Sequence, residues 1–344
     1  MADNVMACNL PVGLFRFTIV PEQPMHVPAV NKGNMLRGAF GHAFRRLCCV
    51  PQCRDANSCP LAASCPYKAI FEPSPPPGSE RLSKNQDIPR PFVFRPPLTQ
   101  QTRFEKGQRF EFGLVLMGRA LEFLPYFVLS FRELATEGLG LNRAKCILER
   151  VEQIGVPSNA AEPGSTREHL VYICDDQLFR ATRSGETEMD VGTRLRELHR
   201  PDRSDSAKRI SIRFLTPTFL RAGGEIVRHP EFHQVFKRLR DRINALSTFF
   251  GDGPLDGDFR GLGDRAEGVR TVSTQIKWAE RYRTSSRTRQ RHEISGFVGE
   301  ATYEGELKEF LPWLVLGELV HVGKHTAWGN GRFEVDCAPP FRGA

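Results

Sequence analysis

The same succession of apolar patterns occurs twice in this 344-residue sequence, and this repetition restricts the fold more than any other feature. In the first part, Phe15, Phe17 and Ile19 alternate with other residues, as in a β-strand, and a helical pattern follows at 35–47, with Asn34 as its expected N-cap. The remaining patterns of this part are two strands, a helix and a strand, at 91–94, 108–116, 121–134 and 142–151. Strand, helix, strand, strand, helix, strand is the order of a ferredoxin-like unit.

The second part repeats this order after a polar connection. Its patterns are a strand, a helix, two strands, a helix and a strand, at 208–215, 232–249, 271–278, 294–302, 306–322 and 332–336. We therefore predict an α+β protein with tandem ferredoxin-like (RRM-like, β-α-β-β-α-β) domains at 1–154 and 208–344. The segment 155–207 is predicted to connect them.

Composition and charge narrow the functional classes. The chain has a formal net charge of +8 and an apolar content of 40%, which is enough for two cores and favours a polyanionic partner. No run of 18 apolar residues is present, so we expect no membrane span. The N-terminal residues do not resemble a signal peptide, and we predict a cytoplasmic protein.

A Cys-rich insertion at 48–72 is the clearest candidate metal site. Five of the nine cysteines lie between Cys48 and Cys65, which indicates a reducing compartment and a metal more than a disulfide framework. The predicted ligands are Cys49, Cys53, Cys59 and Cys65, spaced C-x₃-C-x₅-C-x₅-C. Four thiolates would saturate a structural zinc ion, and the same ligands suit an iron–sulfur cluster. The alternative is a group of reduced thiols without metal.

A glycine-rich stretch precedes the last strand and is a candidate polyanion-binding loop. Its glycines allow close approach of the backbone to a ligand, and basic residues stand beside them. The predicted RNA-binding residues here are Gly323, Lys324, His325, Gly329, Gly331 and Arg332. The alternative is an ordinary turn between a helix and a strand.

Arginines also gather between the strand patterns at 271–278 and 294–302. Arginine pairs with phosphates and stacks on bases, and Trp278 and Tyr282 add aromatic surfaces nearby. The predicted RNA-binding residues of this hairpin are Arg281, Arg283, Arg287, Arg289 and Arg291. A solvated basic loop is the alternative.

The first predicted helix carries polar residues away from its apolar face. His42, Arg45 and Arg46 form a stripe suited to a phosphate backbone, and we add Arg37 to the predicted RNA-binding residues. One interpretation is a general base beside bound RNA. The other is a solvated helix face that happens to include a histidine.

Taken together, these features resemble the CRISPR-associated repeat-RNA endoribonucleases, the Cas-six family of the RAMP superfamily. The resemblance lies in the tandem units, the segment from Gly138 to Lys145 that includes Arg143, and the loop with Gly323, Gly329 and Gly331. It implies that the glycine-rich loop contacts RNA and that precursor CRISPR RNA is cut within its repeats. It also implies a catalytic histidine near the first helix, a placement that His42 matches. The thiolate cluster is not part of the family's minimal pattern.

The resemblance implies cleavage by general acid–base catalysis that needs no metal, leaving 2′,3′-cyclic phosphate and 5′-hydroxyl ends. In this scheme His42 removes the 2′-hydroxyl proton, Lys68 stabilises charge, and Tyr67 positions RNA or shares in proton transfer. His325 is the competing catalytic histidine. The expected partners are CRISPR repeat RNA, the processed crRNA and other CRISPR effector subunits, without a membrane.

Two other classes of function stay open. A non-catalytic RAMP subunit that holds guide RNA in a CRISPR effector complex would keep the arginines and the glycine-rich loop but would not need His42. A metalloprotein with the thiolate cluster as its active centre is less favoured, because four thiolates leave no open coordination position.

Overall fold

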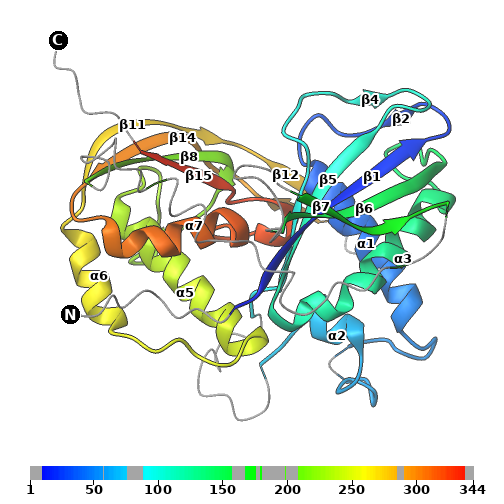
Figure 1. The fold of residues 1–344 in the computed structure, drawn as a ribbon, viewed down its shortest axis with the longest axis horizontal. Coiled ribbons are helices and arrows are strands. Elements are labelled where there is room, and N and C mark those ends of the chain that lie inside the picture. Colours follow the sequence, from blue (N-terminus) through cyan, green and yellow to red (C-terminus); the bar gives the residue numbers. More distant parts are fainter. Residues whose placement is uncertain are drawn as a thin grey trace. The chain divides into compact units, whose positions relative to one another are not determined.

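A computed structural model describes residues 10–56, 58–75, 88–156, 167–175, 179, 198, 208–284 and 290–337 (Figure 1). They divide into two compact units. Described residues up to 179, together with 248–253, form the N-terminal unit, and the other described residues form the C-terminal unit. The predicted domain limits at 154 and 208 stay predictions.

The N-terminal unit contains a five-stranded sheet with the order β3-β5-β1-β6-β7, in which all neighbouring strands are antiparallel. Its strands are β1 (Val12–Pro21), β3 (Phe92–Arg95), β5 (Phe110–Met117), β6 (Cys146–Val156) and β7 (Arg167–Ile173), and β2 (Met25–His26) pairs with β4 (Arg103–Phe104) outside the sheet. Its helices are α1 (Lys32–Cys48), α2 (Pro66–Ile70), the 3₁₀ helix η1 (Gly118–Phe123) and α3 (Leu124–Glu137).

The C-terminal unit contains a four-stranded antiparallel sheet with the order β11-β14-β8-β15. These strands are β8 (Arg209–Thr218), β11 (Arg270–Ala279), β14 (Gly296–Glu304) and β15 (Phe333–Cys337), and two short pairs are β9 (Arg221–Ala222) with β10 (Glu225–Ile226) and β12 (Tyr282–Thr284) with β13 (Arg291–Glu293). The helices are α5 (Phe232–Phe250), α6 (Phe259–Glu267), α7 (Leu311–Val320), and the 3₁₀ helices η3 (Lys308–Phe310) and η4 (Thr326–Trp328). Figure 1 shows α5 and α7 on one side of this sheet.

The first strand of each unit is central in its sheet. In the N-terminal unit β1 lies between β5 and β6, and in the C-terminal unit β8 lies between β14 and β15. In the N-terminal unit, α1 lies between β1 and β3 in the sequence, and α3 lies between β5 and β6. In the C-terminal unit, α5 lies between β8 and β11, and α7 lies between β14 and β15. The prediction of a mixed α+β protein is confirmed.

The alternation in β1 separates a buried face from a partly exposed one. Phe15, Phe17 and Ile19 are fully buried, whereas Arg16 reaches the other face of the sheet. The buried face packs against α3 through Phe17 and Phe131, whose ring centroids are 5.4 Å apart, and Phe40 of α1 stacks on Phe127 of α3 at 4.3 Å. The apolar periodicity therefore correctly predicted which face of β1 and which face of α1 lie in the core.

Several predicted boundaries were wrong. Helix α1 begins two residues before Asn34 and its N-cap is Asn31, because the buried Lys32 donates from Nζ to the carbonyls of Ala29 and Thr99 and holds the helix start. Strand β6 begins at Cys146 and not at 142, because Arg143 adopts a φ of 51° in a turn. Helix α7 begins at Leu311, after η3, rather than at 306, and α6 was missed.

In the described part of the chain, the structure contains no helix with the length and apolar character that crossing a membrane requires.

Truncation of Phe40 tests the aromatic core. Phe40→Ala should lower the free energy of unfolding by about 3–5 kcal/mol, because the side chain is fully buried between α1 and its neighbours. Chemical denaturation followed by circular dichroism measures this change. Leu141→Ala is the control: this side chain is 68% exposed, and the change should be within about 0.5 kcal/mol. Equal effects of the two substitutions would contradict this assignment of the core.

Candidate nucleic-acid interface

The glycine-rich loop joins α7 to β15 and is closed by a backbone hydrogen bond from Val322 N to Gly331 O, 3.0 Å long. Gly331 has a φ of +73°, and a Cβ atom there would lie 1.8 Å from the carbonyl oxygen of Val322. A side chain is therefore excluded by both conformation and space. This glycine is needed for the path of the loop itself, whatever the loop binds.

The end of β8 anchors the loop. Thr216 Oγ1 donates to the carbonyl of Gly329 at 2.8 Å and accepts from the backbone N–H of Arg332 at 2.9 Å. Gly331 N donates to Pro217 O, and Lys324 N donates to Phe219 O. The loop backbone is thus fixed at several points.

A buried histidine and a buried amide support the loop from inside. His321 is fully buried, and its Nδ1 lies 3.1 Å from the carbonyl oxygen of Asn330, whose side-chain Nδ2 donates to Ile294 O. Arg242 of α5 donates from Nε to Val320 O at the end of α7, and burial lowers the pKa of Arg242 to about 10. The sequence analysis missed these supporting residues, because the local pattern does not show that His321, Asn330 and Arg242 are buried.

Aromatic rings and cations gather around the loop. The imidazole of His325 stacks on Trp328, with 4.7 Å between centroids and 18° between planes, and the guanidinium of Arg283 lies 4.3 Å from the centroid of Trp328. Beside them, Lys324 lies 5.5 Å from the ring of Phe219. The predicted basic and aromatic character of this region is present as direct contacts between cations and rings.

Two further pairs of the same kind extend this surface in the C-terminal unit. The guanidinium of Arg228 lies 4.5 Å from the ring of Trp278, and that of Arg291 lies 3.8 Å from the ring of Tyr282. Arg281 donates to the carbonyl of Glu280. Arg332 is partly buried, which lowers its pKa. Arg287 and Arg289 lie outside the described residues.

The arginines predicted on α1 are held within the N-terminal unit. Arg45 donates from Nη2 to the carbonyls of Cys53 and Arg54 in the Cys-rich loop. Arg46 pairs with carboxylates of α3, at 3.1 Å from Glu133 and 2.7 Å from Glu137. Arg37 lies over the ring of Phe71, and Arg143 is exposed in the turn before β6.

The predicted catalytic residues lie on α1 and α2. His42 is exposed, and Phe71, which follows α2, packs against Gly41 next to it. Tyr67 is buried with its ring near Phe44 and its hydroxyl 3.3 Å from Glu72; burial and that carboxylate raise the pKa of Tyr67. Lys68 donates to Ser74 Oγ at 2.6 Å. The packing of α2 on α1 thus brings these two segments together.

The thiols of the Cys-rich loop influence one another. Burial, Cys65 and Cys49 raise the pKa of Cys48 to about 12, and burial, Cys65 and Cys53 raise that of Cys49 to about 11. Among the described residues, however, no group of three or more His, Cys, Asp or Glu side chains is arranged to hold a metal ion. The zinc or iron–sulfur site stays a prediction.

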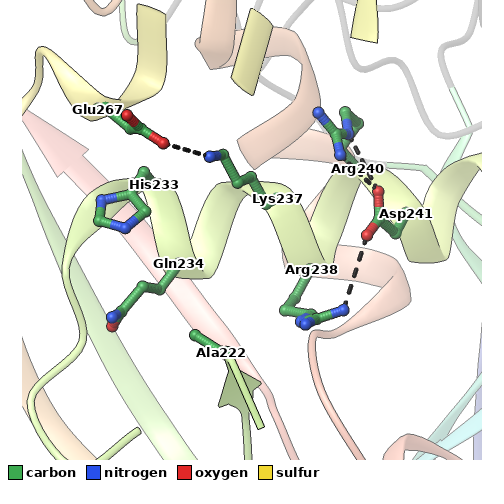
Figure 2. Close-up of a pocket in the computed structure, with 9 residues that line it drawn as sticks. Ala222, His233, Gln234, Lys237, Arg238, Arg240, Asp241 and Glu267 are labelled. Carbon is green, nitrogen blue, oxygen red and sulfur yellow. Dashed lines mark hydrogen bonds and ion pairs between the residues drawn. The ribbon is translucent and has the colours of Figure 1, made fainter. Parts of the chain in front are cut away.

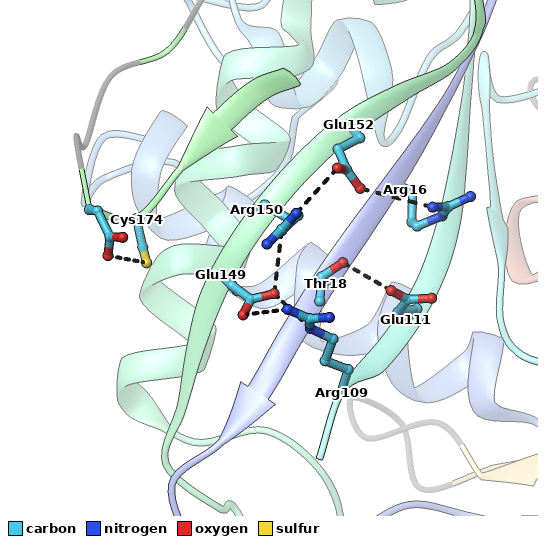
Figure 3. Close-up of polar contacts among 9 residues, drawn as sticks. Arg16, Thr18, Arg109, Glu111, Glu149, Arg150, Glu152 and Cys174 are labelled. Atoms are coloured by element: carbon cyan, nitrogen blue, oxygen red, sulfur yellow. Dashed lines mark hydrogen bonds and ion pairs between the residues drawn. The ribbon is translucent and has the colours of Figure 1, made fainter. Parts of the chain in front are cut away.

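On the sheets of both units, several arginines are paired with carboxylates. On the N-terminal sheet, Glu149 accepts from Arg109 at 2.9 and 3.1 Å, and Glu152 lies near Arg150 and Arg16 (Figure 3). On the C-terminal sheet, Glu304 accepts from both Arg209 and Arg270, which lowers the pKa of Glu304, and Glu334 accepts from Arg213. These sheet faces are mixed ionic surfaces and poor sites for a polyanion.

The first half of α5 borders a hollow of about 300 Å³ (Figure 2). As on the sheets, basic side chains there are paired with carboxylates. Lys237 pairs with Glu267 at 2.6 Å, and Arg240 pairs with Asp241 at 2.8 Å. Arg238 donates to the carbonyl of Arg221. The hollow therefore offers less net positive charge to an anion than its residue types suggest.

The cations around the glycine-rich loop differ from these. Among the described residues, Arg228, Arg283, Arg291 and Lys324 contact aromatic rings and form no ion pair with a carboxylate. Contact with a ring is worth about 0.5–2 kcal/mol and leaves the positive charge in place. This region combines uncompensated charge with flat aromatic surfaces, the two properties that single-stranded nucleic acid requires.

Comparison with known proteins links the chain to CRISPR-associated proteins. A family model described as an N-terminal domain matches residues 10–181, and another, described as CRISPR-associated endoribonuclease Cas6, matches residues 212–333. No curated protein sequence matches the chain. The Cas6 match over residues 212–333 confirms the resemblance to this family that was seen in the sequence. It supports CRISPR RNA processing or RNA binding.

Solved structures show the same fold. The chain is similar to a Cas6 product complex with 18% identity and a TM-score of 0.51, over 94% of this chain and 98% of that one. It is similar to a partial Cas6-RT-Cas1–Cas2 complex with 12% identity and a TM-score of 0.54, over 99% of this chain and 48% of that one, so it spans about half of that chain's length. A structure of Thermus thermophilus Cas6 is similar with 15% identity and a TM-score of 0.48, over 95% and 98% of the two chains.

Substitution of Gly331 tests the loop closure. Gly331→Ala should lower the free energy of unfolding by about 1–3 kcal/mol, because the new Cβ meets the Val322 carbonyl at a positive φ. Thermal unfolding measures the change, and nucleic-acid binding should fall in parallel. Gly38→Ala is the control, because a Cβ at that helical position meets nothing within 4 Å. An unchanged Gly331→Ala variant would contradict the described loop.

Metal analysis tests the predicted ligand set. If Cys49, Cys53, Cys59 and Cys65 bind an ion, protein purified without chelator should contain about one zinc per chain or show an iron–sulfur chromophore. Cys59→Ser should then lower thermal stability more than Cys174→Ser, a control outside the loop.

The metal-free alternative has its own signature. The raised pKa of Cys49, about 11, leaves little thiolate at pH 8, so alkylation there should be slow and should accelerate as the pH rises. Absence of both zinc and iron, together with this pH dependence, would remove the metal prediction.

Proposed function

We propose that this protein is a sequence- and structure-specific endoribonuclease that cleaves precursor CRISPR RNA within its repeats. The family match over residues 212–333 supports this proposal, and so does the fold shared with a Cas6 product complex. The proposed chemistry is metal-independent general acid–base catalysis that leaves 2′,3′-cyclic phosphate and 5′-hydroxyl ends. Its partners are repeat RNA and crRNA, and other CRISPR proteins are proposed partners because a similar structure is titled as a Cas6-RT-Cas1–Cas2 complex.

The observation that carries the RNA-binding part is the distribution of positive charge. Arg283 and Lys324 at the glycine-rich loop rest on aromatic rings, whereas arginines on both sheets, and Arg332 at the end of the loop, pair with glutamates. Since each phosphate neutralised by a free cation releases counterions, the first group contributes to RNA affinity far more than the second. RNA is therefore expected at the loop and the β12–β13 hairpin rather than on the sheet faces.

We also propose that each unit is a ferredoxin-like domain, as the sequence analysis predicted. The strand orders β3-β5-β1-β6 and β11-β14-β8-β15 support this proposal. If the four strands of each motif are numbered 1 to 4 along the chain, both sheets have the spatial order 2-3-1-4. The extra strand β7 extends the N-terminal sheet. The Cys-rich loop lies between α1 and α2 and is an insertion in this scheme.

His42 is the proposed general base. Its position on the exposed side of α1 lets an RNA hydroxyl approach the imidazole, which is the first requirement for acid–base catalysis. Lys68 and Tyr67 follow the Cys-rich loop on α2, and the proposal keeps Lys68 for charge stabilisation. Tyr67 is a weaker candidate for proton transfer, because its buried hydroxyl is engaged with Glu72 and its pKa is raised.

A second candidate function is a non-catalytic RAMP subunit that binds guide RNA. The engagement of Arg45, Arg46 and Tyr67 with protein groups favours it, since a catalytic surface on α1 would have fewer cations available for phosphate. This alternative keeps the glycine-rich loop and its cations unchanged.

Substitution of His42 separates the two functions. His42→Ala should bind repeat RNA normally but slow single-turnover cleavage by about 10²-fold or more, because it removes the base without touching the loop. His26→Ala, an exposed histidine of the same unit, is the matched control and should cleave normally. Cleavage should proceed in EDTA and yield a cyclic phosphate, detected by mass spectrometry of the product.

Other outcomes reassign the roles. Normal cleavage by His42→Ala with loss in His325→Ala would move catalysis to the glycine-rich loop. RNA binding without cleavage by the unaltered protein would favour the guide-binding subunit, and loss of cleavage in EDTA would refute the metal-independent mechanism.

A further inference from the structure

A column at the glycine-rich loop consists of the stacked rings of His325 and Trp328, with a guanidinium over the indole. The imidazole of His325 lies nearly parallel to the indole, and the guanidinium of Arg283, from β12, also lies over it. The indole is partly exposed, whereas Thr326 and Ala327 in the same short helix are buried. The backbone next to Trp328 is held by Thr216 through the carbonyl of Gly329. The column is therefore built on a rigid support and not on a mobile side chain.

Arg283 brings a partly buried positive charge to this column. Burial lowers its pKa, and among the described residues its buried Nε has no hydrogen-bond partner. A guanidinium that has lost water and has no carboxylate beside it is stabilised by an incoming anion. A phosphate meets this requirement, and arginine is the side chain best suited to it.

We propose that Trp328, with His325 and Arg283, holds one unpaired nucleotide of the RNA: its base extends the column and its phosphate pairs with Arg283. This inference rests on the proposed function. Bases within a duplex are already stacked on their neighbours, so a protein ring can take only a base that is free of the helix. The site therefore recognises a single-stranded position of the RNA, and its selectivity is for an exposed ring more than for a particular base.

The second tryptophan with an arginine on it is arranged differently. Both tryptophans have an arginine over the ring, but Trp278 meets Phe219 at 61°, edge to face, whereas Trp328 meets His325 at 18°. Parallel planes, which a base can extend, occur at Trp328. This difference selects Trp328 over Trp278 as the stacking residue.

The experiment compares two probes that carry the same charge. One is a single-stranded oligoadenylate of about eight nucleotides, and the other is an abasic ribose-phosphate chain of the same length, both measured by fluorescence anisotropy with the full-length protein. The unaltered protein should bind the oligoadenylate about 10-fold more tightly or better, because stacking is absent from the abasic probe. Trp328→Ala should lose this preference and keep its affinity for the abasic chain, which also shows that the variant is folded.

Conservative and matched variants sharpen the test. Trp328→Phe should restore most of the preference, since a phenyl ring still stacks, and Arg283→Gln should weaken binding of both probes because it removes a phosphate contact. Trp278→Ala, in the same surface, should lower the affinity for both probes at most equally, so that the ratio of the two affinities stays unchanged. Equal affinity of the unaltered protein for both probes, or a preference that survives Trp328→Ala, would overturn the proposal.

A cleavage assay with repeat RNA distinguishes failure of the stacking proposal from failure of the proposed endoribonuclease function. If the unaltered protein cleaves repeat RNA but Trp328→Ala keeps its ring preference, the stacking proposal fails and the function stands. If no cleavage occurs but Trp328→Ala loses the preference, the stacking site stands and the endoribonuclease proposal fails.

Discussion

The candidate interface depends on the backbone closure between Val322 and Gly331. This hydrogen bond brings the end of α7 against the start of β15, and β15 then pairs with β8 from Phe333 onward. Trp328 lies within the loop that this hydrogen bond closes. The same hydrogen bond therefore affects both the pairing of β15 in the C-terminal sheet and the position of the Trp328 side chain. Glycine at 331 is required because backbone packs directly on backbone there, so this position is fixed by the structure of the loop as well as by its proposed role in binding.

Charge in this protein is organised by what each arginine touches. On both sheets, Arg109, Arg209 and Arg270 are matched with glutamates, so the faces contribute little net field. Around the loop, Arg283 and Lys324 rest on rings, which stabilises the side chain and leaves its charge available. Around the loop, positive charge without a carboxylate partner among the described residues lies directly on aromatic rings, and this combination supports the proposed RNA site.

Helix α1 shows why a residue pattern is an incomplete guide to a site. The spacing of His42, Arg45 and Arg46 predicted a basic stripe, but Arg45 instead holds the Cys-rich loop and Arg46 joins α1 to α3. The partners, Cys53 and Glu133, come from segments whose approach is set by the packing of Phe40 and Phe44 against neighbouring rings. In the same way, Tyr67 follows the thiols in sequence yet is part of the core between α1 and α2.

The sequence by itself determined the types of the elements and their repeated order. The alternation of Phe15, Phe17 and Ile19 and the helical spacing around Phe40 are local patterns, and each pattern allows only one face of its element to be buried. It also marked Gly331 and the basic residues of the loop. Only the tertiary structure decided which cations remain uncompensated, because a carboxylate or ring partner such as Trp328 for Arg283 is distant along the chain. It likewise placed His321 inside the loop's support and His325 on the stacked column, since their surroundings differ only after the chain has folded.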